Sequence, residues 1–280
     1  MRYDLATLAR RVRNVRRSSI VLRDIAPPAV FATNLFRSTY AHVIAAWTDA
    51  LPRINAAYEQ SLSELVTDAP ADVRAEIDGA AEQVNRLLLL LTPGLRDWAL
   101  KVERWDRQKF IGAVLSATSV DLSAVIGPED ARQTVEATIE WNVSLVRDVS
   151  DQARQRISNT VFDGLRNRTP AREVAKELSE KVGMSRRRAL AVSSDQLSKL
   201  TSSLADERRR AAGITAWEWV HSRKAHPRSQ HVARNGNYYS DVAADVGKVL
   251  NGKALLAPPE DRPGQLPWCG CRSRSVITFD

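Results

Sequence analysis

Apolar residues recur every three or four positions over most of the first 210 residues, which is the spacing of one face of an α-helix. The most regular stretch covers residues 128–167 and begins after Gly127. Its apolar stripe consists of Val135, Ile139, Val143, Val146, Val149, Ala153, Ile157, Val161 and Leu165. We expect one nearly continuous helix here, about 60 Å long at ~1.5 Å per residue. Such a length is typical of an elongated assembly protein.

Proline and glycine divide the helical region before this stretch. Arginines surround the apolar positions of residues 3–24, so this segment forms either a basic amphipathic helix or an arm that orders on binding. Pro27-Pro28 should end it. The further helical segments that we predict are residues 29–66 with an interruption at Pro52, residues 70–91 closed by Thr92-Pro93-Gly94, and residues 95–126 with breaks.

Two helices are expected after the long stretch. Thr169 and Pro170 have the residue types of an N-cap and a first helical position. Gly183 should end this short helix, and Ser185 should cap a second one that runs to Gly213. The sequence therefore predicts helices over 170–182 and 186–211.

The pattern changes after Gly213. Residues 214–221 alternate and are rich in aromatic and β-branched residues, which predicts a strand. Asn235-Gly236 is a hairpin-turn signal, residues 247–268 form a loop with three glycines and four prolines, and residues 275–279 form a closing strand. A unit of this size often needs a cross-link to be stable.

The predicted fold class is therefore mainly α, with an elongated helical body of long helices and a small C-terminal α+β domain. The predicted organisation is a basic N-terminal arm (1–28), a helical domain (29–127), a long-helix region (128–212) and the C-terminal domain (213–280).

Composition narrows the class of protein. Hydrophobic residues make up 44% and charged residues 26%, which argues against a disordered or collagen-like chain. The only two cysteines, Cys269 and Cys271, cannot form a disulfide framework, so a reducing compartment is expected. The longest apolar run, residues 87–91, is far shorter than a membrane span, and the first residues show no apolar core of a secretory signal.

The net charge of +8 is spread unevenly. Residues 1–24 carry seven bases and two acids, residues 25–146 ten bases and sixteen acids, residues 147–212 fifteen and nine, and residues 213–280 nine and six. Such asymmetry fits sequence-independent contact with double-stranded DNA, but two solvated basic helix faces explain it equally well. The candidate DNA contacts are Arg10, Arg11, Arg13, Arg16, Arg17, Arg186, Arg187, Arg188, Arg208, Arg209 and Arg210.

Histidine and cysteine cluster near the C-terminus. Imidazole nitrogen and thiolate sulfur are the ligands that Zn²⁺ prefers in tetrahedral structural sites. We predict a zinc ion held by His226, His231, Cys269 and Cys271, with His221 as a spare ligand. The alternative is a set of surface histidines and two ordinary thiols, because the spacing matches no standard zinc finger. His42 stands alone in a helical segment and is interpreted as structural.

These residues resemble the C-terminal part of the phage head morphogenesis family, also called minor head or Mu F-like proteins. The resemblance covers roughly residues 130–280 and rests on the order of its motifs. They are Ala212-Gly213-Ile214, Trp217 and Trp219, His226-Pro227, His231, Asn235-Gly236-Asn237, Tyr238-Tyr239, Pro258-Pro259, Pro263-Gly264-Gln265, Cys269-Gly270-Cys271-Arg272 and Val276-Ile277. Upstream, residues 169–178 and 186–210 resemble the family's short helix and its Arg/Ala-rich helix.

The chain also departs from the family pattern. Gly270 stands where the family has Arg, Trp268 where it has Asn, and Ser193-Ser194-Asp195 where an Arg-Thr-Glu is common. His226 and His231 replace a cysteine pair found in many relatives, which exchanges one zinc ligand type for another.

The resemblance implies a minor head protein of a tailed bacteriophage, present in several copies per head and bound to the portal and the major capsid protein. It would aid head assembly and DNA packaging or delivery, at the capsid interior or the portal vertex, after a stage in the host cytoplasm. No membrane partner and no enzymatic activity are expected. Two alternatives stay open: a nuclease or effector-type enzyme that uses the C-terminal histidines, and a sequence-specific DNA binder built on the helices at 170–182 and 186–211.

Overall fold

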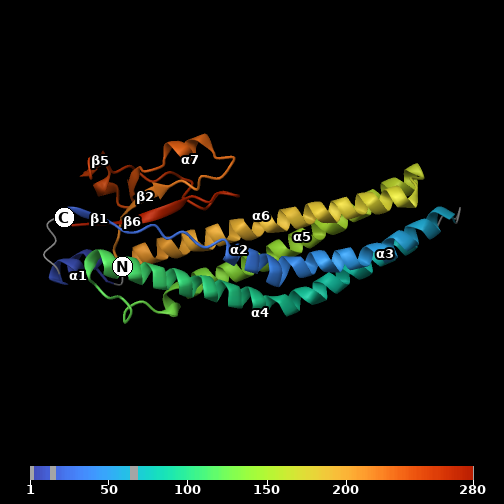
Figure 1. The fold of residues 1–280 in the computed structure, drawn as a ribbon, viewed down its shortest axis with the longest axis horizontal. Coiled ribbons are helices and arrows are strands. Elements are labelled where there is room, and N and C mark those ends of the chain that lie inside the picture. The colour runs from blue at the N-terminus through green and yellow to red at the C-terminus, as the bar shows by residue number, and fades with distance from the viewer. Residues whose placement is uncertain (1–2, 13–16, 64–68, 280) are drawn as a thin grey trace. The chain divides into compact units, whose positions relative to one another are not determined.

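The computed structural model describes residues 3–12, 17–63 and 69–279 and is mainly α with a small C-terminal sheet region, as predicted (Figure 1). The α-helices are α1 (Leu5–Val12), α2 (Val30–Leu35), α3 (Ala41–Ser63), α4 (Ala69–Thr118), α5 (Arg132–Asn167), α6 (Ala171–Ala211) and α7 (Ser229–Ala233). A π-helix spans Phe36–Tyr40, and 3-10 helices span Pro128–Ala131 and Ala243–Asp245. None of the described helices has the length and apolar character of a membrane span.

The chain forms two compact units, each assembled from segments that are distant in sequence. The sheet unit comprises residues 1–31, 99–138 and 194–280, and the helical unit comprises residues 32–98 and 139–193. This grouping differs from the four consecutive regions predicted above, because the unit boundaries fall inside α2, α4, α5 and α6 rather than at proline or glycine residues.

Buried aromatic residues with polar anchors hold the helical unit together. Trp47 and Tyr58 are fully buried on α3. The Trp47 indole donates a hydrogen bond to Ser150 Oγ at 3.1 Å, and the Tyr58 hydroxyl donates one to the Thr169 carbonyl at 2.7 Å. These bonds satisfy polar atoms that would otherwise be buried without a partner, so they fix the positions of the helices within this unit.

The long helix predicted over residues 128–167 is confirmed as a 3-10 turn followed by α5. Most of its stripe is buried, while Val143 and Leu165 are half-buried. The other predicted interruptions are wrong: Pro52 lies inside α3, Pro93 inside α4 and Gly183 inside α6.

The surroundings of Pro93 and Gly183 explain why α4 and α6 continue through them. Pro93 is exposed and cannot donate to the carbonyl of Leu89, which is itself 74% exposed, so water can reach that carbonyl. Val182 and Ala189 are buried on either side of Gly183. Burying one Val side chain is worth ~1.5–3 kcal/mol, more than the ~1 kcal/mol that glycine costs a helix.

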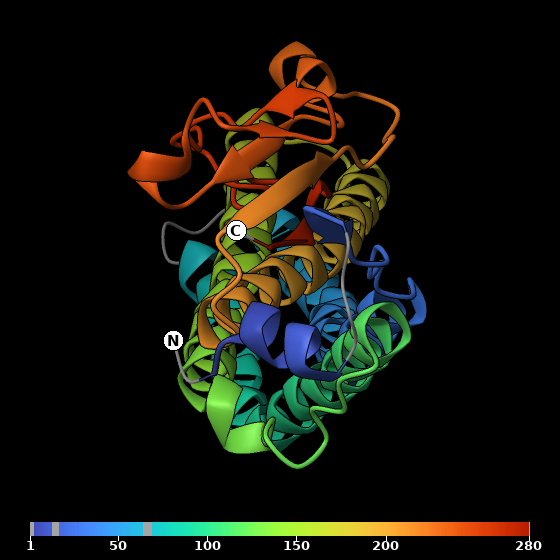
Figure 2. The same ribbon diagram turned by 90° about the vertical axis from the view of Figure 1, so that its left-hand side faces the viewer.

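A four-stranded antiparallel sheet forms the centre of the sheet unit (Figure 2). The strand order is β1-β6-β2-β3, with β1 at Ser19–Val21, β6 at Arg272–Thr278, β2 at Ala216–Val220 and β3 at Tyr238–Ser240. The predicted strands over 214–221 and 275–279 are confirmed as β2 and β6, and they pair directly. In the loop predicted over 247–268, β4 (Val249–Leu250) and β5 (Lys253–Ala254) form a small hairpin.

Two local expectations for the sheet unit need correction. The segment predicted as one helix or arm over 3–24 is divided between α1 and β1, because Ile20 pairs with Ile277 in the sheet. Asn235-Gly236 does form a turn, with Gly236 at a φ of +77°, but α7 precedes it, so it does not join two hairpin strands directly.

The N-terminal segment belongs to the core of the sheet unit. Leu5 and Ala9 of α1 are fully buried and lie in one cluster with Phe110, Val114 and Ile277. Pairing with β6 places β1 in the same unit. Residues 5–12 and 19–21 are therefore structural rather than a detachable arm.

Alanine substitution at Gly183 tests the continuity of α6. A Cβ atom built at Gly183 meets no atom within 4 Å, so Gly183→Ala should stabilise the protein by ~0.5–1 kcal/mol through helix propensity. Gly164→Ala in α5 is the matched control, because its Cβ would lie 2.8 Å from Tyr58 Oη and 2.9 Å from Val174 Cγ2, and it should destabilise. Urea unfolding measures both; a loss of stability in Gly183→Ala would mean that α6 is broken there.

Candidate metal centre

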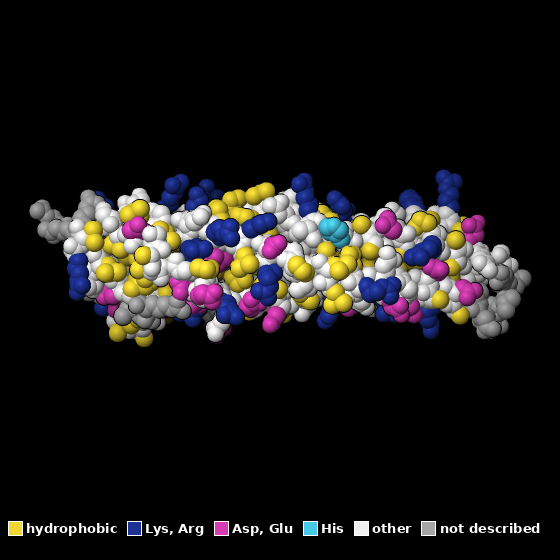
Figure 3. All heavy atoms as spheres, turned by 90° about the horizontal axis from the view of Figure 1, so that it is seen from below, with side chains coloured by type: hydrophobic (Ala, Val, Ile, Leu, Met, Phe, Trp, Pro, Cys, Tyr) yellow, Lys and Arg dark blue, Asp and Glu magenta, His cyan; other side chains and the backbone are white. Residues whose placement is uncertain are grey.

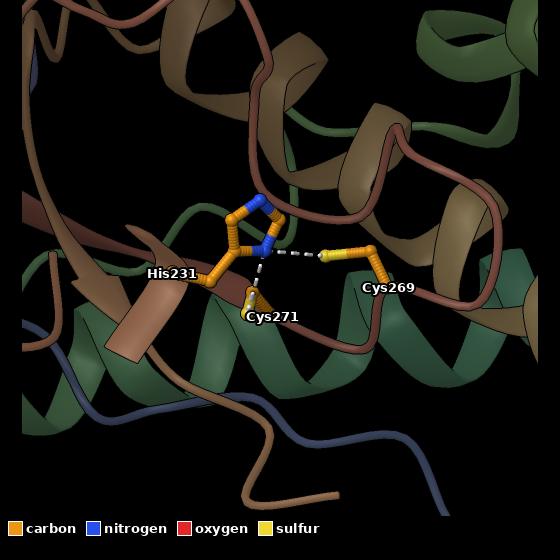
Figure 4. A group of neighbouring side chains, drawn as sticks. All are labelled: His231, Cys269 and Cys271. Carbon is orange, nitrogen blue, oxygen red and sulfur yellow. Dashed lines mark hydrogen bonds between the residues drawn. The ribbon is translucent and has the colours of Figure 1, made fainter. Parts of the chain in front are cut away.

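The topology of the sheet unit brings His231, Cys269 and Cys271 together. His231 lies on α7, in the connection between β2 and β3, and its N–H donates to the Arg228 carbonyl at 3.0 Å. The two cysteines lie in the segment that enters β6. Because β2 lies between β3 and β6, the connection that carries His231 and the segment that carries the two cysteines both lie next to β2 (Figure 4).

The geometry of these three side chains fits a metal ion. Cys269 Sγ lies 3.4 Å and Cys271 Sγ 3.7 Å from His231 Nδ1, and the three ligand atoms are all within 4.8 Å of one another. Tetrahedral zinc with Zn–S near 2.3 Å and Zn–N near 2.0–2.1 Å separates its sulfur and nitrogen ligands by roughly 3.5 Å. The three atoms therefore already have the spacing of ligands around one ion.

A carboxylate orients the histidine. His231 Nε2 lies 2.8 Å from Asp261 Oδ2, and the Arg234 guanidinium donates to Asp261 Oδ1 at 2.7 Å. With the Nε2–H donating to Asp261, the Nδ1 lone pair faces the two sulfurs, which is the tautomer that a metal requires. Burial raises the pKa of Asp261, but the hydrogen bonds from Arg234 and His231 outweigh it and hold the pKa below its ordinary value.

The two thiols influence each other directly. The hydrogen bond with Cys271 is the main reason that the pKa of Cys269 is lowered to about 5, against the opposing effect of burial. The same contact, together with burial, raises the pKa of Cys271. The contact therefore favours a thiolate on Cys269, the form that binds metal.

An aromatic shell keeps water away from this group. Trp217 and Trp219 are fully buried and Tyr239 nearly so, and all three pack with the cysteines. The Trp219 ring stands edge-on to His231 at 5.1 Å between centroids. Only 3% of Cys269 and 2% of Cys271 is exposed, so any ion held here would be shielded from solvent.

The cysteine segment is anchored to α6. The Trp268 N–H donates to Asp195 Oδ1 at 2.6 Å, and the Cys269 N–H donates to the Leu266 carbonyl at 3.0 Å. Gly264 adopts a φ of +81°, and a Cβ there would lie 2.8 Å from Ser202 Cβ, so only glycine fits against the helix. No spacing pattern in the sequence signals the roles of Asp195, Arg234 and Asp261, because each acts on a residue that is distant from it in the chain.

Three of the four predicted ligands thus lie together, but His226 does not belong to the group. His226 is exposed in the loop before α7, and Arg228 at the helix N-cap is extended, so His226 lies outside the helix that carries His231. The Nδ1 of His221 accepts a hydrogen bond from the Arg223 N–H at 3.1 Å. His42 is exposed on α3.

The same atoms resemble a second kind of site. Cys269, His231 and Asp261 form a hydrogen-bonded series of thiol, imidazole and carboxylate. Cysteine enzymes use the same series, in which the thiol is the nucleophile and the imidazole is its base. A nucleophile needs an accessible sulfur, whereas both sulfurs here are buried and both face one nitrogen. The arrangement therefore suits metal ligation better than covalent catalysis.

Several arginines predicted to contact DNA are used inside the protein. Arg208 is buried and pairs with Asp106 at 2.7 Å and Glu103 at 3.2 Å. Arg209 is buried against Asp206 and donates to Ser273 Oγ at 2.6 Å. For these two, the prediction is corrected: their guanidinium groups are enclosed and cannot reach phosphate.

The other candidate arginines differ in their surroundings. Arg188 pairs with Asp148 and Arg210 with Glu207, while Arg10 and Arg186 lie over the rings of Phe279 and Phe36. Arg11, Arg17 and Arg187 are exposed, and Arg13 and Arg16 lie outside the described residues. On the face drawn in Figure 3, basic side chains are interspersed with acidic ones.

Removing Arg208 should destabilise the fold. Arg208→Ala would leave Asp106 as a buried, uncompensated carboxylate, while Glu103 would keep only its pair with Arg107 at 3.1 Å. We therefore expect a loss of about 3–5 kcal/mol in the free energy of unfolding. Arg210→Ala, close to the buried pair on the same helix, removes a partner of an exposed salt bridge and should change stability by less than about 1 kcal/mol. Equal effects in chemical denaturation would contradict the structural role of Arg208.

Comparisons with known proteins give one weak likeness. The chain is 24% identical over 155 residues to an uncharacterized protein of Haemophilus influenzae. The matched region covers 53% of this chain and 35% of that protein, so the chain spans about a third of the relative's length. No protein-family model matches the chain, and no solved structure matches it.

Proposed function

We propose that this protein is a minor head structural protein of a tailed bacteriophage, associated with the portal and assisting head assembly and DNA packaging or delivery. The observation that carries the proposal is the convergence of the motif residues. The motif residues are spread from 217 to 271 in the sequence, yet they pack around one point in the sheet unit. They are Trp217, Trp219, His231, Tyr239 and the two cysteines. Motifs that form one folded module support the resemblance better than their order alone.

The chemistry of the module supports a structural role. We propose that Zn²⁺ binds to His231 Nδ1, Cys269 and Cys271, with Asp261 holding the histidine. Such an ion joins α7 to the segment entering β6 across a long, proline-rich connection. Closing a loop of that length costs a few kcal/mol, whereas a structural zinc site contributes on the order of 10 kcal/mol in small peptides.

The proposed partners follow from the same role. The portal protein and the major capsid protein are the expected protein partners, with several copies of this chain at the capsid interior or the portal vertex. Before assembly the protein would be in the host cytoplasm. Sequence-independent contact with double-stranded DNA is assigned to the exposed arginines Arg11, Arg17 and Arg187.

An enzyme is the second candidate, favoured by the Cys269–His231–Asp261 hydrogen-bonded series. Treatment of the native, metal-free protein with iodoacetamide separates the two candidates. A catalytic thiolate reacts rapidly in the native protein, whereas a buried ligand pair reacts at a comparable rate only after denaturation.

Metal analysis tests the zinc proposal. Protein purified without chelator should contain about one zinc per chain, and Cys269→Ser or His231→Ala should lose it. Asp261→Asn should weaken zinc binding by roughly 10–100-fold, because it removes the group that orients His231. His226→Ala is the matched control and should retain the metal. Binding should weaken on acidification, since protons compete for both sulfurs and for Nδ1.

The opposite result has a clear meaning. Zinc-free protein whose C-terminal segment resists protease as well as the zinc-loaded form would show that packing alone holds the module.

DNA binding tests the assignment of the exposed arginines. Triple substitution of Arg11, Arg17 and Arg187 by Glu should weaken binding to random-sequence duplex DNA and flatten its salt dependence, by a slope of about 0.9 for each phosphate that is no longer neutralised. The triple Lys variant keeps the charge and should retain most of the binding. Deletion of residues 1–24 is unsuitable, because α1 and β1 belong to the core. Equal binding by the Glu and Lys variants would favour two solvated basic faces.

Assembly tests the function itself. A tagged copy of the chain, expressed in the bacterium while phage heads form, should sediment with the heads and co-purify with a portal and a major capsid protein. Heads that form and package DNA normally while this chain stays at the top of the gradient would contradict the proposal.

A further inference from the structure

The outer edge of β1 offers main-chain hydrogen bonds that nothing in the described part of the chain uses. β1 pairs on one side only, with β6. The Leu22 N–H donates to the Ser275 carbonyl and the Phe279 N–H donates to the Ser18 carbonyl, both at 2.9 Å. In an antiparallel ladder such bonds alternate, so the N–H and C=O groups of Val21 and Arg23 turn away from β6.

A groove runs along this edge. Its volume is about 1000 Å³, and it is enclosed by residues 21–28 on one side and by one face of α4 from Trp105 to Ala117 on the other. The α4 wall contains small residues, and a Cβ built at Gly112 meets no atom within 4 Å. Trp105 packs edge-on against Phe31 with ring centroids 5.7 Å apart. The wall therefore leaves room for a main chain beside β1.

The uncompensated charge of the groove is positive. Arg23 and Lys109 are exposed, and neither forms an ion pair with a described residue. The remaining charged residues of the lining are neutralised, since Asp24 pairs with Arg272 at 2.6 Å and Arg274 donates to Glu218 at 2.9 Å. An occupant with acidic side chains complements the two free cations.

We propose that this groove binds an extended, acidic segment of a partner protein, which adds a strand to the outer edge of β1. Its main chain pairs with the outward groups of Val21 and Arg23. Alternate side chains point to the two sides of a strand. Apolar ones would lie on Ala113 and Ala117 of α4, with Lys109 one turn away on the same helix face, and acidic ones on the other side would meet Arg23. Strand addition of this kind obtains its affinity from the main chain and its specificity from the alternating side chains.

This inference is independent of the zinc ion and of the proposed role in phage heads. The groove lies between the β1 edge and α4, and it shares no lining residue with the group of His231, Cys269 and Cys271. Zinc loss or failure to join heads therefore leaves the strand-addition proposal untouched, and its own failure leaves the proposed function untouched.

The test uses the full chain and a fluorescein-labelled synthetic peptide that alternates glutamate with valine. We expect binding by fluorescence anisotropy and slowed hydrogen exchange at the amides of Val21 and Arg23. Val21→Pro removes one outward donor without breaking the β1–β6 ladder and should weaken binding about tenfold, equivalent to ~1.4 kcal/mol. Gly112→Phe fills the groove from α4 and should abolish binding while the helix is retained.

Charge variants complete the test. Lys109→Glu should weaken binding, whereas Lys101→Glu, on α4 but outside the groove, should not. A peptide alternating lysine with valine should bind more weakly than the glutamate peptide. The proposal is overturned if the glutamate peptide does not bind, if Gly112→Phe binds it unchanged, or if duplex DNA rather than the peptide protects Val21 and Arg23 from exchange.

Discussion

The contact between one imidazole nitrogen and two sulfurs organises the C-terminal module. His231 comes from the connection between β2 and β3, and the sulfurs come from the segment that enters β6. The proline-rich connection is also held by Trp268 on Asp195 and by Arg262 on Asp241, but only this centre joins α7 to the segment that carries the sulfurs through buried side chains. Asp261, in the middle of that connection, fixes the imidazole and so ties a third segment to the same centre.

Burial decides what this centre can do. The same three residue types form a nucleophile and its base in cysteine enzymes, where the sulfur faces a cleft. Here the sulfurs lie beneath Trp217, Trp219 and Tyr239, and the helix α6 anchors the cysteine segment through Asp195. An environment that excludes water favours a held ion over a reacting substrate.

The local pattern of apolar residues was sufficient to predict the elements in which that pattern repeats over many positions. Residues 128–167, β2 and β6 were predicted because their periodicity extends over several turns or alternations. Single breakers were over-weighted: Gly183 costs a helix about 1 kcal/mol, which the burial of Val182 and Ala189 exceeds, and Pro93 lies on an exposed face of α4. β1 was missed because its pairing with residues 276–278 depends on contacts over almost the whole chain.

In the candidate metal centre too, the sequence indicated residues that are close together in the chain and missed those that come from distant segments. Residue type alone suggested His231, Cys269 and Cys271, since sulfur and imidazole are rare in this sequence and cluster at its end. His226 was included through proximity in sequence, but Pro227 and the extended Arg228 separate it from α7. Asp261 had no sequence signal, because a carboxylate that orients a ligand follows no fixed spacing.

X-ray absorption at the zinc edge tests the central claim most directly, because it reports the atoms bound to the metal. The account predicts two sulfur neighbours near 2.3 Å and nitrogen or oxygen neighbours near 2.0–2.1 Å in the zinc-loaded protein. It also predicts the loss of one sulfur neighbour, or of the metal altogether, in Cys271→Ser. A zinc shell that contains only oxygen and nitrogen, unchanged by that substitution, would contradict it.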